Sequence, residues 1–360
     1  MKVTQLSIIL VTSGKQPLIR YSLLSLLCQI TDQDELIVSV NSSEIAHLSF
    51  ITQLVSEIDN FCKIKIVSTT KNISVYEHYC FGIRQATNDR VIIVHDDDVY
   101  NPGMLEEIRI GFSDPDVNVV VGGLLKIDRI GKNFKSTVEN SFETSCYQDG
   151  RLWLEKSKGL YPPFCFSALA VRRSALDLRL LTANSTAADC MVVTQLALSG
   201  KVYQSRMMFA TWTQLPSSTS KWALIKPGLI SPWKEYLDYS QSINEDWLKN
   251  LALENKRKSL KIFSKMLFVV AIANQNHCQI DSCLKKIGEI SVLSQNLLSW
   301  TRFPMIYYPL SIPCLLAVKL KAYLRLKNFQ KTASPIDPCK ELNLDRHFWI
   351  SYTLEILVKR

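Results

Sequence analysis

The sequence lacks the residue spacings of a zinc site, a disulfide framework and a dinucleotide-binding loop. Its ten cysteines are scattered without a Cys-x-x-Cys pair, and its five histidines show no metal-ligand spacing. No Gly-x-Gly-x-x-Gly follows the first apolar segment, which disfavours a nucleotide-binding fold of the dehydrogenase type. We therefore expect reduced, mostly buried thiols in a cytoplasmic protein.

The sequence also has little that indicates a membrane span. The N-terminus leads directly into a strand-like segment, without an apolar signal core and a small-residue cleavage site. Residues 303–318 are uncharged, but these 16 residues include three prolines and fall short of the roughly 20 that span a bilayer. Because basic residues follow, the run is either a core helix with a solvated end or a segment in a membrane interface. We expect a cytoplasmic location, and peripheral attachment to the inner face of the plasma membrane stays open.

The positive charge of the chain is confined to its last third. Of the 360 residues, 47% are hydrophobic and 21% are charged, which is ordinary for a globular protein. Residues 1–240 contain 24 Lys and Arg against 24 Asp and Glu, whereas residues 241–360 contain 18 against 9. The net charge of +9 therefore lies after residue 240, where it favours an anionic partner or a basic helical surface. Nucleic acid is disfavoured as this partner because no helix-turn-helix or aromatic RNA-binding signature occurs.

Apolar segments and helical periodicity alternate through the first hundred residues. We expect strands at 6–11, 35–40, 62–67 and 91–94, separated by helices at 18–30, 44–58 and 75–86. This alternation predicts an α/β fold with a doubly wound, mostly parallel sheet flanked by helices.

The remaining elements are expected to extend this sheet and then to give way to helices. We predict strands at 118–125 and 202–210, a strand ending at 171, helices at 147–158 and 189–199, and irregular segments at 126–146 and 211–234. After residue 240 the pattern is helical. We place a domain boundary between residues 235 and 236, so that residues 236–360 form a basic, mainly helical C-terminal region.

Three adjacent carboxylates, Asp96, Asp97 and Asp98, follow the buried strand at 91–94. Carboxylates at the carboxyl end of a strand lie where open α/β sheets bind ligands. Oxygen-only ligands suit a divalent cation such as Mn²⁺ or Mg²⁺, which in turn bridges phosphate groups. The alternative is an acidic turn in solvent, with Asp98 capping the next helix.

About the first 215 residues resemble the family-2 glycosyltransferases of the GT-A fold, of the bacterial surface-polysaccharide type. The resemblance rests on ordered segments rather than on one motif, namely 7–13, 23–29, 71–73, 91–98, 166–175, and Asp189 with 196–203. It implies that residues 1–235 form a catalytic domain that binds a nucleotide-sugar. The enzyme implied is an inverting, metal-dependent hexosyltransferase in polysaccharide biosynthesis. Its donor would be a nucleotide-sugar, with a UDP-sugar favoured, and its acceptor a hydroxyl of a glycan or lipid-linked saccharide.

The resemblance also assigns roles to residues of this sequence. Asp98 would bind the Mn²⁺ or Mg²⁺ directly, with Asp96 beside it. Asp189 would be the catalytic base, and a helix cap is its alternative. Trp212 would stack on a sugar at the acceptor side, where core packing is the alternative, and Arg172 would lie on the same side. Donor binding would involve Thr12, Ser13, Asn41, Asn72, Asp96 and Asp97.

Several positions depart from the family pattern. Asn41 stands where the family commonly has an acidic residue for the base and ribose, and His95 can be aligned with the first aspartate of the acidic motif. Gly14-Lys15, Tyr79-Cys80 and Ala188-Asp189 replace the usual Asn-Arg, Arg-Asn and Glu-Asp pairs. A second hypothesis is therefore that the protein is a catalytically inactive GT-A-like scaffold in a synthase complex. Metal-dependent nucleotide binding would distinguish the enzyme from this scaffold.

Overall fold

The computed structural model describes most of the first 214 residues and a few later ones. The described ranges are 4–13, 18–42, 44–58, 64–130, 133–139, 142–157, 165–182 and 188–214, with scattered positions between 236 and 253. They fall into two compact units, which divide between Leu215 and Pro216. Most of the C-terminal region expected at 236–360, the run at 303–318 and the segment at 215–234 therefore lie outside the described residues. No helix among the described residues combines the length and the apolar character that crossing a bilayer requires.

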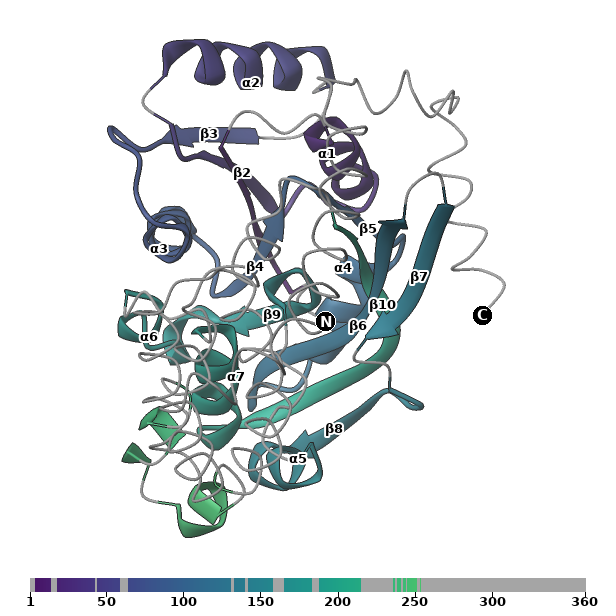
Figure 1. Cartoon of the computed structure of the whole chain (residues 1–360), viewed down its shortest axis with the longest axis vertical. Coiled ribbons are helices and arrows are strands. Elements are labelled where there is room, and N and C mark those ends of the chain that lie inside the picture. Colours follow the sequence, from purple (N-terminus) through teal and green to yellow (C-terminus); the bar gives the residue numbers. More distant parts are fainter. Residues whose placement is uncertain are drawn as a thin grey trace, which may run out of the picture. The chain divides into compact units, whose positions relative to one another are not determined.

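Ten strands of the described residues form one sheet, which organises the first unit (Figure 1). Its first half is parallel and has the spatial order β3-β2-β1-β4. These strands are β1 Ser7–Thr12, β2 Glu35–Val40, β3 Ile64–Ser68 and β4 Arg90–His95. The chain adds strands outward from β1 to β3 and then returns to place β4 on the other side of β1. This reversal makes the gap between β1 and β4 a topological switch point, where ligands bind in open α/β sheets.

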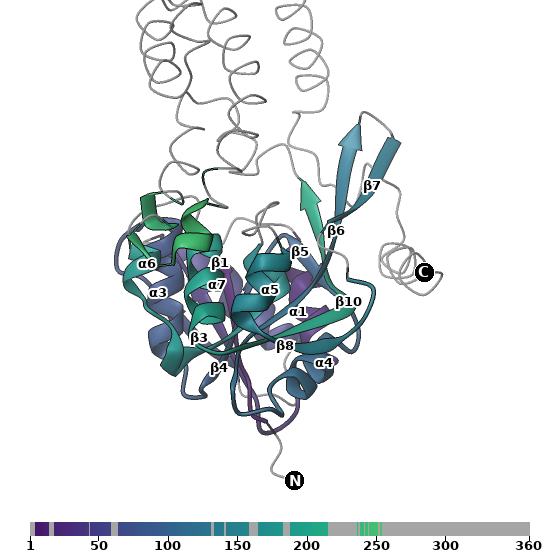
Figure 2. The ribbon, with the colours of Figure 1, turned by 90° about the horizontal axis from the view of Figure 1, so that it is seen from below.

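The second half of the sheet is mixed and continues as β4-β9-β6-β10-β5, with β7 paired to β6 and β8 to β10. Its strands are β5 Asp98–Tyr100, β6 Val117–Ile130, β7 Asn133–Glu139, β8 Cys146–Asp149, β9 Leu169–Arg172 and β10 Lys201–Gln214. β9 is antiparallel to both of its neighbours, β4 and β6. Figure 2 shows β7 and the end of β6 projecting away from the helices that cover the sheet.

Helices cover both faces of the sheet. The helices α1 Ile19–Leu27, α2 Ile45–Ile58 and α4 Met104–Gly111 share one apolar core with strand residues such as Ile8 and Leu10. Ile9 alternates with these two and faces α3 Val75–Gln85, where a Cβ on Gly82 would lie 2.6 Å from the Ile9 Cγ2. Of the remaining helices, α5 Gly150–Lys156 and α6 Arg179–Thr182 each contact α7 Ala188–Leu198, and α6 also contacts α3.

The doubly wound α/β fold with a mostly parallel first half is confirmed, but one part of the prediction is wrong. Residues 126–146 were expected to be irregular, whereas β6 continues to Ile130 and β7 and the start of β8 follow. The segment 133–139 contains only two apolar residues, Phe134 and Val138. Its polarity suggested a loop. The helix expected from residue 147 begins at Gly150, after β8.

Candidate active site

The four parallel strands bring polar side chains to one edge of the sheet. In the register of the ladder, Thr12 at the end of β1 pairs with Val40, and Val11 pairs with His95 at the end of β4. Asn41 follows β2, and its N–H donates to the Thr12 carbonyl at 2.8 Å. The expected donor-binding residues at these strand ends therefore lie at the switch point beside the acidic turn.

Helix α1 fixes the acidic turn that joins β4 to β5. The Ser22 hydroxyl donates to the Asp98 carbonyl at 2.6 Å, and the Tyr100 N–H donates to the Ser25 Oγ at 3.1 Å. The His95 N–H donates to the Tyr100 hydroxyl at 2.6 Å. Because these contacts are short and mostly buried, the backbone of the turn is held on both sides.

Asp98 is the most buried member of the turn. It is 0% exposed, and its Oδ1 has no hydrogen-bond partner among the described residues. Its Oδ2 accepts a hydrogen bond of 2.5 Å from the Ser167 hydroxyl and lies 3.6 Å from the His95 Nδ1. The helix-cap alternative for Asp98 is excluded, because Asp98 opens β5 and Gly103, with φ at +88°, occupies the N-cap of α4.

The surroundings of Asp98 fit a divalent cation. Ligand atoms of His95, Asp97 and Asp98 all lie within 4.8 Å of one another. A buried carboxylate oxygen without a donor carries a large desolvation cost, which a cation would offset. Asp96, the second expected ligand, does not belong to this group.

Charge crowding and burial shift the neighbouring carboxylates. Burial raises the pKa of Asp96 to about 6, although a hydrogen bond from the Thr12 side chain lowers it. Burial, with the Asp98 carboxylate next in importance, raises the pKa of Asp97 to about 7. Both shifts indicate an environment in which additional negative charge is costly unless positive charge is close.

Asp189 lies in the first turn of α7 and belongs to the same neighbourhood. Burial raises its pKa to about 7, while hydrogen bonds from the backbone of Asp189 and Cys190, together with the charge of His95, lower it. Burial raises the pKa of Tyr76 and of Tyr79, and the charge of Asp189 adds to both shifts. The structure therefore brings Asp189 near His95 although 94 positions separate them in the sequence. The backbone hydrogen bonds agree with the helix-end alternative, which is compatible with a catalytic role.

Asn41 holds the loop between β3 and α3. Its Nδ2 donates to the Ile73 carbonyl at 2.8 Å, and its Oδ1 accepts from the Ile73 N–H at 3.0 Å and from the Thr69 hydroxyl at 3.3 Å. The expected donor-binding residues Ser13 and Asn72 are both exposed near these strand ends. Thr12 is 3% exposed.

The two residues expected on the acceptor side have different positions. Trp212 pairs with Asp98 in the ladder between β10 and β5, and it packs against the main hydrophobic core. Arg172 pairs instead with Arg90, the first residue of β4, at the edge of the sheet opposite the acidic turn. The structure therefore places Trp212 beside the turn and Arg172 away from it.

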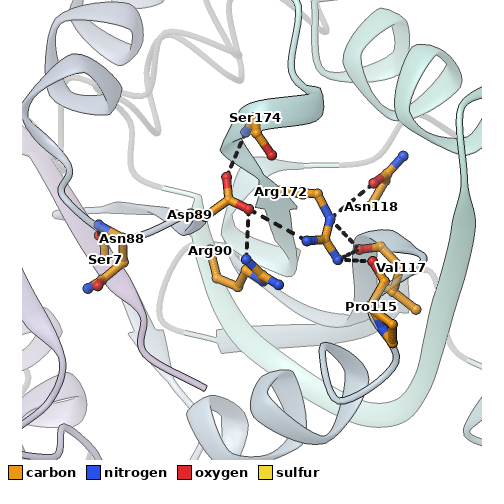
Figure 3. Close-up of polar contacts among 9 residues, drawn as sticks. All are labelled: Ser7, Asn88, Asp89, Arg90, Pro115, Val117, Asn118, Arg172 and Ser174. Atoms are coloured by element: carbon orange, nitrogen blue, oxygen red, sulfur yellow. Dashed lines mark hydrogen bonds and ion pairs between the residues drawn. The ribbon is translucent and has the colours of Figure 1, made fainter. Parts of the chain in front are cut away.

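Figure 3 shows that the guanidinium of Arg172 is engaged within the protein. It donates to the carbonyls of Pro115 at 2.5 Å and Val117 at 2.8 Å, and to the Asn118 Oδ1 at 3.1 Å. Its Nη1 lies 3.5 Å from the Asp89 carboxylate. Since these contacts tie β9 to the segment before β6, the geometry gives Arg172 a structural role.

Sequence reasoning missed Ser167 and Tyr79 as residues of the site. Ser167 lies in the 3₁₀ turn Phe166–Ala168 before β9 and contacts Asp98 across 69 positions. Tyr79 lies on α3, and its hydroxyl contacts the His95 Nε2 at 2.9 Å. The one available signal was the departure at these places from the family pattern, where His95 and Tyr79 stand in unusual positions.

We compared the sequence and the fold with those of known proteins. Residues 7–177 match the model of glycosyl transferase family 2. No curated protein matches the sequence. The solved structure of S. aureus TarS 1–349 with UDP-GlcNAc matches at a TM-score of 0.60 and 15% identity, covering 89% of this chain and 92% of that one. TarS 1–349 with UDP matches with the same coverage at a TM-score of 0.58 and 14% identity. Because the sequence identities are so low, these matches show a similar fold only.

Proposed function

We propose that this glycosyltransferase, whose residues 7–177 match the model of glycosyl transferase family 2 and adopt a GT-A fold, is inverting and cation-dependent. It moves a sugar from a nucleotide-sugar donor to a hydroxyl of a glycan or lipid-linked saccharide. The observation that carries the proposal is the buried Asp98 Oδ1 at the switch point, which has no hydrogen-bond partner among the described residues. Asp189 interacts with the neighbouring His95.

The acidic turn would hold the cation and the donor. Asp98, whose Oδ1 has no hydrogen-bond partner among the described residues, and Asp97, which is grouped with it, would hold Mn²⁺ or Mg²⁺. The cation supplies positive charge that offsets the donor diphosphate and stabilises the departing nucleotide. Asp96, which hydrogen-bonds the Thr12 side chain, would contact the ribose or water bound to the cation. Ser13, Asn41 and Asn72 complete the donor side at the neighbouring strand ends.

Asp189 would be the catalytic base. Its carboxylate takes the proton from the acceptor hydroxyl while the hydroxyl oxygen attacks the anomeric carbon and the nucleoside diphosphate leaves. One displacement of this kind inverts the anomeric centre. Trp212, beside Asp98 in the ladder, offers an aromatic face to the sugar, whereas Arg172 is left out of the acceptor side on the contacts described above.

The donor is proposed to be a UDP-sugar and the pathway polysaccharide biosynthesis. The matching TarS structures contain UDP-GlcNAc and UDP, which supports the uridine nucleotide through likeness of fold. The net charge of +9 after residue 240 supports an acceptor that carries a pyrophosphate-linked lipid, and peripheral attachment at a membrane. The compartment that fits these roles is the cytoplasm.

The test is calorimetric titration of the purified protein with UDP, GDP and CMP, with and without Mn²⁺. We expect one nucleotide to bind, and its binding to require both Mn²⁺ and Asp98, so that Asp98→Asn abolishes it. Asp189→Asn should bind the same nucleotide normally but transfer no sugar. Transfer by either variant at the wild-type rate would overturn the role assigned to that residue.

One observation favours the inactive scaffold as a second candidate. Both ends of the Asn41 amide are engaged by the backbone of Ile73, so this residue replaces the usual acidic residue without offering a carboxylate to the donor. If no nucleotide binds with any metal, the scaffold hypothesis gains and the enzyme hypothesis loses its support.

A further inference from the structure

We propose that Tyr79, His95 and Ser167 form a directed hydrogen-bond chain that positions the Asp98 carboxylate and leaves its Oδ1 for the cation. They are positioning residues, since none of them is required to touch the sugar or the reacting atoms. The inference rests on the proposed function, because it concerns the affinity of the acidic turn for its cation.

The chain is continuous and crosses four elements. The Tyr79 hydroxyl on α3 lies 2.9 Å from the His95 Nε2 at the end of β4. The His95 Nδ1 lies 2.9 Å from the Ser167 Oγ in the turn before β9. The Ser167 hydroxyl contacts the Asp98 Oδ2 at 2.5 Å, at the start of β5. Tyr79, His95 and Ser167 are therefore linked in series to one carboxylate oxygen, the Asp98 Oδ2.

Counting hydrogens fixes the direction of the chain. An ionised carboxylate only accepts, so Ser167 must donate its single proton to Asp98. The Ser167 Oγ is then an acceptor, and the His95 Nδ1 must carry the hydrogen. The His95 Nε2 continues the chain to the Tyr79 hydroxyl. The donors of His95 and Ser167 then both point toward Asp98, an arrangement that strengthens successive hydrogen bonds in a buried setting.

Packing keeps the chain in place. The Tyr79 ring stacks on His95 with a centroid separation of 5.8 Å and meets the edge of Phe166 at 5.2 Å. Tyr79 is 7% exposed and Ser167 is 1% exposed. Since neighbouring rings and the turn before β9 restrict these rotamers, the chain is formed before any ligand arrives.

The same geometry argues against His95 as a direct ligand. The Nδ1 is the imidazole atom that faces Asp98, and it carries the hydrogen that Ser167 accepts. The oxygen of Asp98 without a partner is Oδ1, whereas the chain ends on Oδ2. One carboxylate oxygen is thus fixed by protein donors while the other stays available. Outer partners of this kind typically change metal affinity 10- to 100-fold, by order of magnitude.

The experiment measures Mn²⁺ affinity by calorimetry on the full chain without nucleotide, together with the melting temperature. We expect Ser167→Ala to weaken Mn²⁺ binding about 10- to 100-fold, and Ser167→Thr to restore most of it. His95→Asn keeps a donor close to the Nδ1 position and should bind Mn²⁺ more tightly than His95→Ala. Tyr79→Phe removes the outermost hydroxyl of the chain and should have the smallest effect of the series.

Ser39→Ala is the matched control. Ser39 is also fully buried and also hydrogen-bonds a histidine, His78, at 2.8 Å, but it lies within β2, which β1 separates from β4 and the turn. It should lower the melting temperature about as much as Ser167→Ala and leave Mn²⁺ affinity unchanged. If Ser167→Ala and the wild-type protein bind Mn²⁺ with equal affinity, the role proposed for the hydrogen-bond chain is wrong.

Two further outcomes are distinguishable from that one. If His95→Asn changes the ratio of Mn²⁺ to Mg²⁺ affinity while Ser167→Ala does not change Mn²⁺ affinity, His95 is a direct ligand and the chain is overturned. If the wild-type protein itself binds no divalent cation, the cation-dependent function fails, and with it the purpose assigned to the chain.

Discussion

A carboxylate that accepts a proton during sugar transfer must be ionised beforehand, and the surroundings of Asp189 oppose this. Burial raises its pKa to about 7 from an ordinary value of 3.8. The fraction of molecules with an active base should therefore fall as the pH drops below 7. We expect kcat/KM for transfer to decrease about tenfold per pH unit on the acid side of this pKa. A pH profile of initial rates at saturating Mn²⁺ measures it.

The control for this profile is nucleotide affinity over the same pH range, which separates loss of the base from loss of donor binding. Rates that stay constant down to pH values near the ordinary aspartate pKa would remove Asp189 as the base. Rates and affinity that fall together would locate the titration in the acidic turn instead.

The same shift predicts that Asp189 lowers the stability of the fold. The folded pKa lies above the unfolded one, so the ionised carboxylate destabilises the folded state at pH values above about 7. This cost disappears as the pH falls below the unfolded pKa. We expect Asp189→Asn to raise the melting temperature at pH 8 by several degrees, since about 1 kcal/mol corresponds to roughly 2–4 °C in a domain of this size.

Calorimetric scans at pH 8 and pH 5 check this prediction. The difference between Asp189→Asn and wild type should be smaller at pH 5, where the wild-type residue is mostly protonated in the folded state. A lower melting temperature of Asp189→Asn than of the wild type at pH 8 would contradict the predicted direction of the stability change. It would mean that the hydrogen bonds at the start of α7 outweigh burial.

At the residue scale, the sequence allowed prediction of some of the site residues only. Asp98 and Asn41 follow strands whose carboxyl ends share one edge, so local pattern and one fold rule place them together. Ser167 belongs to the site because β9 inserts beside β4, and no local pattern indicates that its hydroxyl meets Asp98. Arg172 shows the converse, since a basic residue after a family-like strand suggested an acceptor-side role, whereas its guanidinium binds internal carbonyls.

At the scale of elements, β9 depends on the contacts of Arg172. We expect Arg172→Ala to lower the free energy of unfolding by about 1.5–3 kcal/mol, because the carbonyls of Pro115 and Val117 lose a charged donor. Arg172→Lys should recover only part of this, since a lysine offers no planar fork. Urea titration of each variant measures the loss, and affinity for nucleotide and Mn²⁺ should stay at the wild-type value.

Arg173→Gln controls for the general removal of a positive charge at this edge, although Arg173 also donates to the Ala86 carbonyl. A smaller loss is expected there, because the Arg173 side chain has one such contact in the described residues. Full stability of Arg172→Ala combined with a raised KM for the acceptor would restore the acceptor-side role expected from the sequence.

The elements that could be predicted from local sequence are those whose pattern of apolar residues matches their burial in the fold. β1, β2 and β4 are continuous apolar runs, and α3 begins with a capping box between Ser74 and Glu77. The ribbon of β6 and β7 was missed because its polar composition is typical of a loop and its few apolar residues show no regular alternation. The antiparallel insertion of β9 was also beyond reach, because strand order depends on contacts distant in sequence.

At the scale of the whole molecule, the net charge is distributed unevenly along the sequence. The first 240 residues carry no net charge, and the last 120 carry +9. A surface with this excess should bind anionic lipid head groups through Coulombic attraction, with about 1 kcal/mol for each basic residue near the membrane. We expect the full chain to sediment with phosphatidylglycerol-containing vesicles at about 0.1 M salt and to be released at about 1 M, where the screening length falls to roughly 3 Å.

Two triple variants locate the attraction. Lys256→Gln, Arg257→Gln and Lys258→Gln remove three charges from the basic third and should weaken vesicle binding by about tenfold or more. Arg84→Gln, Arg151→Gln and Arg206→Gln remove the same charge from exposed positions of the first unit and should change it little. Equal loss in both variants would mean that net charge alone drives adsorption. Binding that persists at about 1 M salt would indicate insertion of apolar residues, because screening leaves only the hydrophobic contribution.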